Sequence, residues 1–403
     1  MKKVGIYQQK WNTSYDSQHL LGLIAQILSE RNEVEFISHD SSLNQERMGK
    51  AMGADLSRTS VRLVDSPDWT QNNSSFSLKS AREFCQEISA PYEVFLNASN
   101  DLPIFCNAKN GILLTEFPGC DFDVFFEHNS LGWKNTGFIK RFFRKRKEAL
   151  IWSCRLSSYQ KHWCFSDFTR QWCGKKWQIS PKILPLVRGF DLEKMEKKPL
   201  IVVLGKFSEE NLDRHDLLIN AFQDFVDKMI SRLGLSPDWK MLILGECDGA
   251  EKNLEFVERL REKAYGYPIE IIVNPDQEKV RVSLAEALFL WNAKGYETNE
   301  FHPECQEHIG IKILKAQNAG VIPIVFHAGC VSEVIRHGMN GFLWSKYREM
   351  IDFTSAIMVE ERILPILGQG AFENAKKYDE NMLRKTLSEE VKNVLEVTSR
   401  ESE

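Results

Sequence analysis

The fold is decided by residues 291–344, which read WNAKGYETNEFHPECQEHIGIKILKAQNAGVIPIVFHAGCVSEVIRHGMNGFLW. Within this stretch, residues 321–326 (VIPIVF) are almost wholly apolar, which is typical of a strand covered on both faces in a parallel sheet. The helical pattern before them opens at Glu307 and stops at Gly320, a residue type common just past a helix end. After a tight turn at residues 328–330, Ser332 and Glu333 predict the cap of a further helix. This arrangement brings backbone N–H groups to the carboxyl edge of a sheet, where doubly wound folds bind phosphorylated ligands.

Strands and helices alternate outward from this stretch, as they do in parallel sheets. The other predicted strands are residues 3–8, 34–38, 92–96, 111–115, 124–129, 163–165, 201–205, 240–244, 269–273 and 287–291. The other predicted helices are residues 18–30, 215–230, 253–264, 279–286, 371–378 and 380–397, one helix that Ser166 caps, and one amphipathic helix within residues 39–80. Trp172 and Trp177 are expected to pack between domains. The charged, non-periodic residues 187–200 indicate a hinge.

We therefore expect an α/β protein of two doubly wound domains, residues 1–190 and 191–379, followed by a helix at about 380–403. A chain of 403 residues is long enough for two such cores. Its 52 basic and 56 acidic side chains give a net charge of −4, so no global field favours nucleic acid. The nine cysteines show neither zinc-site spacing nor a disulfide pattern, which indicates free thiols in a reducing compartment. The first residues predict a strand rather than a signal peptide, and no apolar run is long enough to span a membrane, so a cytoplasmic location is expected.

Residues 291–344 resemble the donor-binding half of retaining GT-B glycosyltransferases of the family 4 type, particularly their mannosyltransferase-like branch. The matching positions are Trp291, Ala293, Gly295, Tyr296, Pro303, Glu304, Glu307, His308, Gly310, Ile311, Ala316, Gly320, Pro323, Gly329, Glu333, Gly338, Asn340, Gly341, Phe342 and Leu343. The resemblance implies a GT-B fold, in which two Rossmann-like domains face each other across a cleft. It also implies that the last helix, at about 380–403, crosses back onto the first domain. It implies transfer of a hexose from a nucleotide-sugar to a hydroxyl of a glycan or lipid-linked acceptor, with the anomeric configuration kept. The nucleotide-sugar is a substrate, and neither a cofactor nor a metal is implied.

The same resemblance assigns the site residues. Glu307 and His128 are the expected catalytic residues beside the transferred sugar, although a lone histidine at a strand end also suits capping or packing. The expected donor-binding residues are Lys206, Arg214, His308, Ile309, Gly310, Lys315, Gly329, Cys330 and Glu333. GDP-mannose is favoured as the donor over UDP- or dTDP-sugars on the likeness to the branch alone.

Several donor-contact positions depart from the family pattern. The departures are Lys206 for Arg, Asp213 for Lys, Lys315 for a second Glu, Asn292 for His, Cys330 for Gly, and a first loop, residues 12–15, without glycine. Two hypotheses follow from them. The chain is an active transferase with altered donor recognition, or it is a degenerate GT-B protein that binds a ligand or partner without turnover. The survival of Glu307, His128 and Lys206 favours the first.

Residues 134–147 carry seven basic side chains and no acidic one. As a helix they would place aromatic residues beside cations, a pattern typical of contact with an anionic membrane surface. The expected contact residues are Phe138, Lys140, Arg141, Phe142, Arg144 and Lys145. The alternative is a half-solvated helix that packs its phenylalanines on the core.

Overall fold

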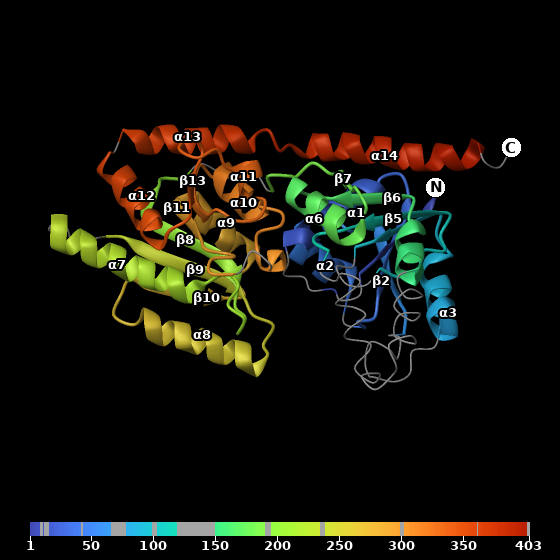
Figure 1. Ribbon diagram of the computed structural model, residues 1–403, viewed down its shortest axis with the longest axis horizontal. Helices are drawn as coiled ribbons and strands as arrows, with labels where there is room; N and C mark the ends of the chain where they lie inside the picture. Colours follow the sequence, from blue (N-terminus) through green and yellow to red (C-terminus); the bar gives the residue numbers. More distant parts are fainter. Residues whose placement is uncertain are drawn as a thin grey trace, which may run out of the picture. The chain divides into compact units, whose positions relative to one another are not determined.

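The computed structural model describes residues 1–8, 11, 16–41, 43–65, 78–98, 103–118, 150–189, 195–233, 238–298, 302–360 and 362–400. The chain forms two compact units (Figure 1). Unit 1 consists of Met1–Pro185 and Asn381–Glu403, and unit 2 of Leu186–Glu380. Both termini therefore belong to unit 1. Within the described ranges, no helix is both long and apolar enough to cross a membrane.

Unit 1 is built on a parallel sheet whose described strands follow the order β3-β2-β1-β4-β5-β6-β7. These strands are β1 (Lys3–Tyr7), β2 (Glu33–Ser38), β3 (Thr59–Leu63), β4 (Val94–Asn97), β5 (Asn110–Leu114), β6 (Lys161–Cys164) and β7 (Lys182–Ile183). The central strands β4 and β5 are buried along their whole length, which explains their continuous apolar sequences.

The helices of unit 1 carry the apolar residues that cover this sheet. They are α1 (Asp16–Ser29), α2 (Gln45–Met52), α3 (Leu78–Ser89), α6 (Asp167–Trp177) and α14 (Glu380–Arg400). Ser166 is the N-cap of α6, as predicted, and its side chain accepts a hydrogen bond from the Thr169 N–H at 3.1 Å. Trp177 packs on Trp152 inside the core of unit 1, and Trp172 stacks near Phe117. The prediction that Trp177 packs between domains was therefore wrong, and the same expectation for Trp172 stays a prediction.

Unit 2 has a second parallel sheet, with its described strands in the order β10-β9-β8-β11-β12-β13. The strands are β8 (Lys198–Lys206), β9 (Lys240–Glu246), β10 (Ile269–Val273), β11 (Ala287–Asn292), β12 (Ile322–Phe326) and β13 (Phe342–Trp344). The helices are α7 (His215–Leu233), α8 (Glu251–Ala264), α9 (Gln277–Glu286), α10 (Ile311–Asn318), α11 (Val331–Val334), α12 (Tyr347–Val359) and α13 (Ile363–Ala375), with a 3₁₀ turn η3 (Pro303–Cys305).

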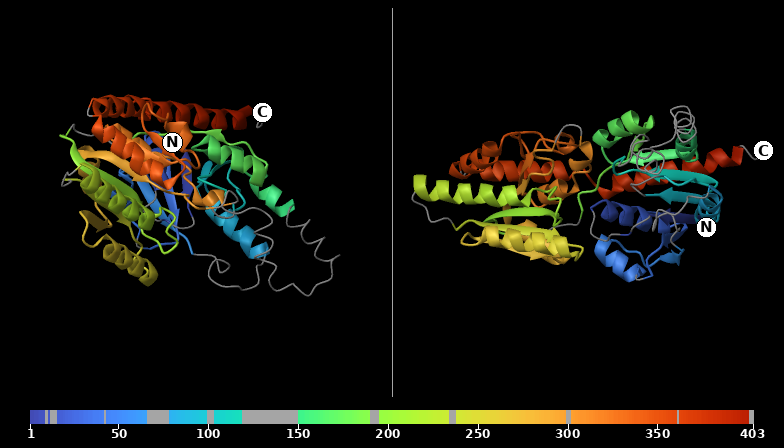
Figure 2. Two further views of the ribbon diagram at one scale, coloured as in Figure 1. Left: turned by 60° about the vertical axis from the view of Figure 1, so that its left-hand side comes forward. Right: turned by 60° about the horizontal axis from the view of Figure 1, so that its bottom comes forward.

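Alternate side chains of the unit 2 sheet enter one large core. Residues of β8, β9, β11 and β12 pack there against α7, α8 and α12, and aromatic side chains such as Phe222, Phe225 and Trp291 fill its centre. Helix α9, which connects β10 to β11, packs against β8, and α10 packs against β12. Figure 2 shows helices on both faces of each sheet.

Both sheets have the strand order of a Rossmann fold. In unit 2 the chain first builds outward from β8 through β9 to β10, and then returns to add β11 on the other side of β8. Ligands of such sheets bind at the carboxyl ends of the strands, where the order reverses. In unit 2 this switch point lies between the ends of β8 and β11, and in unit 1 between those of β1 and β4.

Three predictions about local structure are corrected. Helix α10 begins at Ile311 rather than at Glu307, because Gly310 with φ +79° breaks the helical backbone. Helix α11 is capped at Cys330, so Ser332 and Glu333 lie inside it. Helix α13 begins at Ile363, earlier than the predicted residues 371–378.

Candidate functional site

The site of unit 2 is assembled at the switch point from four segments. Strand β8 ends at Lys206, and β11 ends at Asn292, two residues before Lys294. The loop before α10 contributes Glu307, and the turn after β12 contributes Gly329. Each of these residues ends a strand or lies in the segment that follows one. Because the strands are parallel, their carboxyl ends bring these residues to one edge of the sheet.

Glu307 is a buried carboxylate at the centre of this edge, with only 6% of its surface exposed. Its Oε1 accepts a hydrogen bond from the Gly310 N–H at 3.1 Å, and its Oε2 lies 3.8 Å from the Lys294 Nζ. Among the described residues, no group donates a hydrogen bond to the buried Oε2. A buried, charged oxygen without a donor is costly, so this atom is suited to accept a hydroxyl of a bound ligand.

The Gly329 turn fixes the backbone of Glu307. The Cys330 N–H donates to the Glu307 carbonyl oxygen at 2.8 Å. Gly329 has φ +74°, and a Cβ on it would overlap that same oxygen. The predicted donor-binding N–H groups of Gly310 and Cys330 are thus bonded to Glu307, so their role in this structure is to hold the carboxylate. Burial, with Glu307 nearby, raises the pKa of the Cys330 thiol well above its ordinary value.

A second buried carboxylate, Asp213, lies at the end of β8. Its Oδ2 accepts a hydrogen bond from the Lys206 N–H at 2.8 Å, and its Oδ1 lies 3.5 Å from the Lys312 Nζ. Burial raises the pKa of Asp213, but Lys312 and, after it, Lys294 outweigh this effect and lower the pKa to about 2. Asp213 is therefore a permanent anion within the site.

His215 lies behind this carboxylate and is fully buried. Neither ring nitrogen has a hydrogen-bond partner among the described residues, and the ring packs against Phe207 with centroids 5.0 Å apart. Burial lowers the pKa of His215 to about 4, although Asp213 opposes the shift. The imidazole is consequently neutral at physiological pH and does not balance the charge of Asp213.

The other predicted donor-binding residues have varied surroundings. The Arg214 guanidinium donates to the Glu297 carboxylate, and the aliphatic part of Lys315 lies close to Gly189. The His308 ring bonds to the Pro303 carbonyl oxygen at 3.1 Å. The remaining two are Ile309, which is buried, and Glu333, which is exposed on α11. The structure therefore gathers Glu307, Gly310, Gly329, Cys330 and Lys206 at one edge, whereas Arg214 is occupied by Glu297.

Several predicted residues lie outside the described residues. They are His128, the membrane-contact residues Phe138, Lys140, Arg141, Phe142, Arg144 and Lys145, and the first loop, residues 12–15. Their roles stay predictions.

Sequence reasoning missed Lys294 and Lys312, the cations nearest the two buried carboxylates. Their positions carried a signal, because Lys294 follows directly on the strand beside the switch point and Lys312 lies in the first turn of the next long helix. Searching the residues after each predicted strand end for paired charges would have found Lys294. The partner of Lys312 could not be read from spacing, since Asp213 is 99 positions away.

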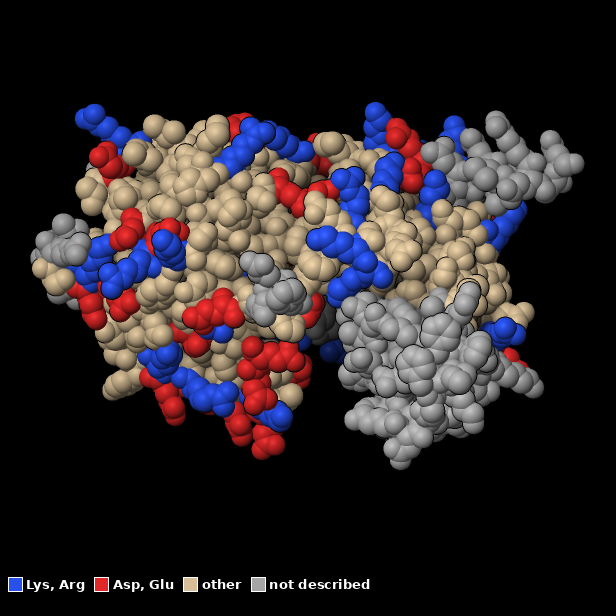
Figure 3. Space-filling model, in the orientation of Figure 1, with Lys and Arg blue, Asp and Glu red and all other residues tan. Residues whose placement is uncertain are grey.

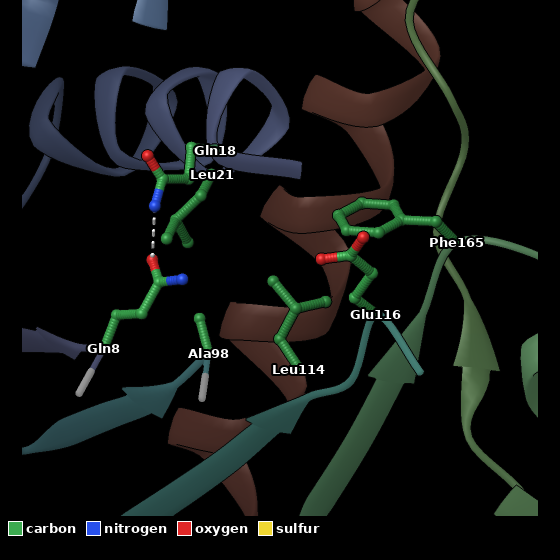
Figure 4. Close-up of a pocket in the computed structure, with 7 residues that line it drawn as sticks. All are labelled: Gln8, Gln18, Leu21, Ala98, Leu114, Glu116 and Phe165. Atoms are coloured by element: carbon green, nitrogen blue, oxygen red, sulfur yellow. Dashed lines mark hydrogen bonds between the residues drawn. The ribbon is translucent and has the colours of Figure 1, made fainter. Parts of the chain in front are cut away.

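Unit 1 has a small hollow at the carboxyl edge of its own sheet (Figure 4). Gln8 and Gln18 lie on one side of it, with Gln18 Nε2 donating to Gln8 Oε1 at 3.4 Å, and Glu116 and Phe165 lie on the other. The lining residues are Gln8, Gln18, Leu21, Ala98, Leu114, Glu116 and Phe165. None of these seven is a cation. Gln18 is 1% exposed, and within the described chain its Oε1 has no hydrogen-bond donor.

Within the described ranges, no three His, Cys, Asp or Glu side chains gather in a way that could hold a metal ion.

Comparison with known proteins identifies the class of this chain. Residues 189–359 match the family model "Glycosyl transferases group 1". Comparison with curated protein sequences gives no match.

Solved structures that resemble the chain extend over both units. The Anabaena protein HepE, in complex with UDP and glucose, has a TM-score of 0.67 at 12% identity, covering 98% of this chain and 100% of HepE. Sucrose-phosphate synthase from Thermosynechococcus elongatus has a TM-score of 0.65 at 10% identity, with 98% and 100% covered. WaaG, a glycosyltransferase involved in lipopolysaccharide biosynthesis, has a TM-score of 0.60 at 12% identity, with 95% and 98% covered. At such low sequence identities, the structural similarity establishes the fold alone, which is GT-B. With a glycosyl transferases group 1 domain at residues 189–359 on this fold, the chain is a glycosyltransferase.

Proposed function

We propose that the protein is a retaining glycosyltransferase of the family 4 type, which moves a hexose from a nucleotide-sugar to a hydroxyl of a glycan or lipid-linked acceptor. The observation that carries the proposal is the buried Glu307, whose Oε2 has no hydrogen-bond donor among the described residues and lies at the switch point of unit 2. In this proposal Oε2 accepts a hydrogen bond from a hydroxyl of the hexose, while the Lys294 ammonium lies 3.8 Å from the same oxygen.

The donor's diphosphate is proposed to bind at the same edge. Negative charge builds on the departing phosphate as the glycosidic bond to it breaks, and fixed cations at that point lower the barrier. Lys206 ends β8 beside the site, and the start of α10 adds the partial positive charge of a helix N-terminus. GDP-mannose is the donor that the sequence resemblance favours, and UDP-glucose is the natural comparison because the similar structure of HepE is in complex with it.

The acceptor is proposed to bind at the carboxyl edge of the unit 1 sheet, where the hollow, with a volume of about 20 Å³, has room for a single hydroxyl group. Two amides and a carboxylate offer both donors and acceptors to hydroxyl groups, and Leu21, Leu114 and Phe165 offer apolar contact. A lining without a cation disfavours a phosphate group at this point, so the hollow suits a neutral, hydroxyl-bearing part of the acceptor.

The proposal is tested by the release of nucleoside diphosphate from GDP-mannose, UDP-glucose, dTDP-glucose and ADP-glucose. Glu307→Gln keeps the shape and the Gly310 bond but removes the charge, and we expect it to lower kcat by about 10²–10³. The control is Glu304→Gln, since the Glu304 side chain is 41% exposed and bonds to His302. Wild-type activity in Glu307→Gln would contradict the proposed site, and absence of turnover with every donor would favour a binding protein. The anomeric configuration of the product, read by NMR, tests retention separately.

A further inference from the structure

The Asp213–Lys312 pair is a feature of the site to which the proposed function gives no role. Asp213 lies in the loop between β8 and α7, and Lys312 lies 99 positions later, in the first turn of α10. Their charged atoms are 3.5 Å apart. An anion at the edge where a diphosphate is to bind would repel that ligand, so its presence there requires a physical reason.

Asp213 is held too firmly to be an incidental surface charge. Its side chain is 9% exposed and accepts the Lys206 N–H at the end of β8. The neighbouring His215 is neutral, as shown above, so the charge of Asp213 is balanced by lysines. Lys312 has the largest influence and Lys294 the next. Lys294 and Lys312 thus lie beside the two buried carboxylates, Glu307 and Asp213.

The two partners differ in depth. The Asp213 side chain lies inside, whereas that of Lys312 is 19% exposed and forms the outer member of the pair. Lys312 also belongs to the first turn of a helix whose N-cap, Gly310, offers no side chain to its N–H groups. The ammonium group and the helix start therefore attract an anion at the same place. An ammonium group has three N–H donors, so a lysine can hold a carboxylate and a phosphate oxygen together.

We infer that Lys312 is the donor-binding cation that contacts the diphosphate, and that Asp213 is the positioning residue that holds Lys312 in place. The inference rests on the proposed function, because it assigns the diphosphate of the proposed donor to a particular side chain. It assigns Arg214 no contact with the diphosphate, since that guanidinium is bonded to Glu297.

The test is calorimetric titration of the full chain with UDP and with inorganic pyrophosphate. Lys312→Met is expected to weaken binding of both ligands by about tenfold or more. Asp213→Asn, which keeps a partner for the Lys206 N–H, is expected to weaken both by a smaller factor. The matched control is Lys228→Met, because Lys228 is 25% exposed and paired with Asp352 at 2.7 Å. It should leave both affinities unchanged.

The exchanged pair Asp213→Lys with Lys312→Asp separates positioning from mere stabilisation. It restores opposite charges, so the melting temperature should recover relative to either single reversal. It also turns the outer charge negative, so binding of UDP and pyrophosphate should stay lost. Recovery of both properties together would show that the pair is only structural and would overturn the inference.

Two further outcomes also contradict the inference. They are unchanged affinity in Lys312→Met, and a wild-type protein that binds neither UDP nor pyrophosphate at millimolar concentration. The proposed function fails in a different way. Binding that depends on Lys312, without release of nucleoside diphosphate from any donor sugar, would refute the transferase and leave the inference standing.

Discussion

At residue 329 the structure has no room for a side chain, and this makes the position of Glu307 testable. We predict that Gly329→Ala destabilises the protein and abolishes transfer, because the new Cβ would displace the Glu307 backbone. Gly338 is the matched control, since it has φ +76° and an added Cβ would meet nothing within 4 Å. Gly338→Ala should cost only the left-handed strain, about 1–2 kcal/mol in urea unfolding, with activity kept. Equal losses in the two variants would contradict this account.

His215 predicts how stability depends on pH. Burial lowers its pKa from 6.5 to about 4 in the folded protein. Asp213 and Asp216 oppose this shift, and Lys312 adds to it. As pH falls below 6.5 the unfolded chain takes up a proton that the folded chain refuses, so stability is lost progressively down to about pH 4.

We therefore expect His215 to account for a loss of about 2 kcal/mol between pH 7 and pH 5. Urea unfolding of His215→Leu should show a smaller loss over this interval than the wild type. The control is His302→Gln, because the His302 side chain is 60% exposed. A wild-type slope in His215→Leu would show that the buried imidazole does not titrate as described.

Individual site residues were predictable from the sequence where a local pattern specifies them. Glu307 stands in a loop just before Gly310, the residue at the N-cap of α10. Gly329 stands in a turn directly after a buried strand. The partners Lys294 and Lys312 were not found, because a charge gains its role from a carboxylate that is distant in sequence. Likewise, the bond from Arg214 to Glu297 joins two loops whose proximity only the folded sheet creates.

At the scale of elements, helix α14 is tied to unit 1 by a buried carboxylate. Glu390 is 6% exposed, with Lys182 at 2.7 Å and Lys161 at 4.0 Å. Burial raises the pKa of Glu390, but Lys182 and then Lys161 lower it by more. We predict that Glu390→Gln lowers the free energy of unfolding by about 1–3 kcal/mol, since it leaves Lys182 without this partner. The neighbouring Glu389 is exposed, so Glu389→Gln should change stability by less than about 0.5 kcal/mol in the same denaturation measurement.

Several elements with a regular apolar repeat were predicted, whereas helices α3 and α12 were missed. Strand β10 has the predicted bounds, because residues 269–273 are β-branched and apolar except for Glu270. Strands β3, β7 and β13 were not predicted, and β7 has only two residues. Strand β3 is half-exposed at the sheet edge with a mixed sequence, and β13 is three residues long. Such strands are specified by their pairing with β2 and β12 rather than by their own residues.

At the scale of the whole molecule, charge is divided unevenly between the units. Unit 1 contains 28 basic and 24 acidic side chains, and unit 2 contains 24 basic and 32 acidic ones. On the face shown in Figure 3, the two signs are mixed over unit 2, while basic side chains predominate on the described surface of unit 1. The excess of positive charge thus belongs to the unit that includes residues 134–147.

Residues 134–147 contribute seven of these 28 basic side chains and account for the excess, and we propose that they contact anionic membranes. We predict that the protein co-sediments with vesicles containing phosphatidylserine, and that binding falls as salt rises. Replacing Lys140, Arg141, Arg144 and Lys145 by Gln should reduce binding strongly. Replacing the same number of exposed lysines on unit 2 should not. Sedimentation that is independent of lipid charge would remove the case for a membrane surface.

The central claim is that the carboxyl edge of the unit 2 sheet holds the donor through Glu307 and the lysines around it. The most direct measurement is a crystal structure of the protein with a bound nucleotide-sugar. The account predicts diphosphate oxygens within hydrogen-bonding distance of Lys312 and a hexose hydroxyl on the Glu307 Oε2. A diphosphate bound elsewhere, or a sugar that does not contact Glu307, would contradict it.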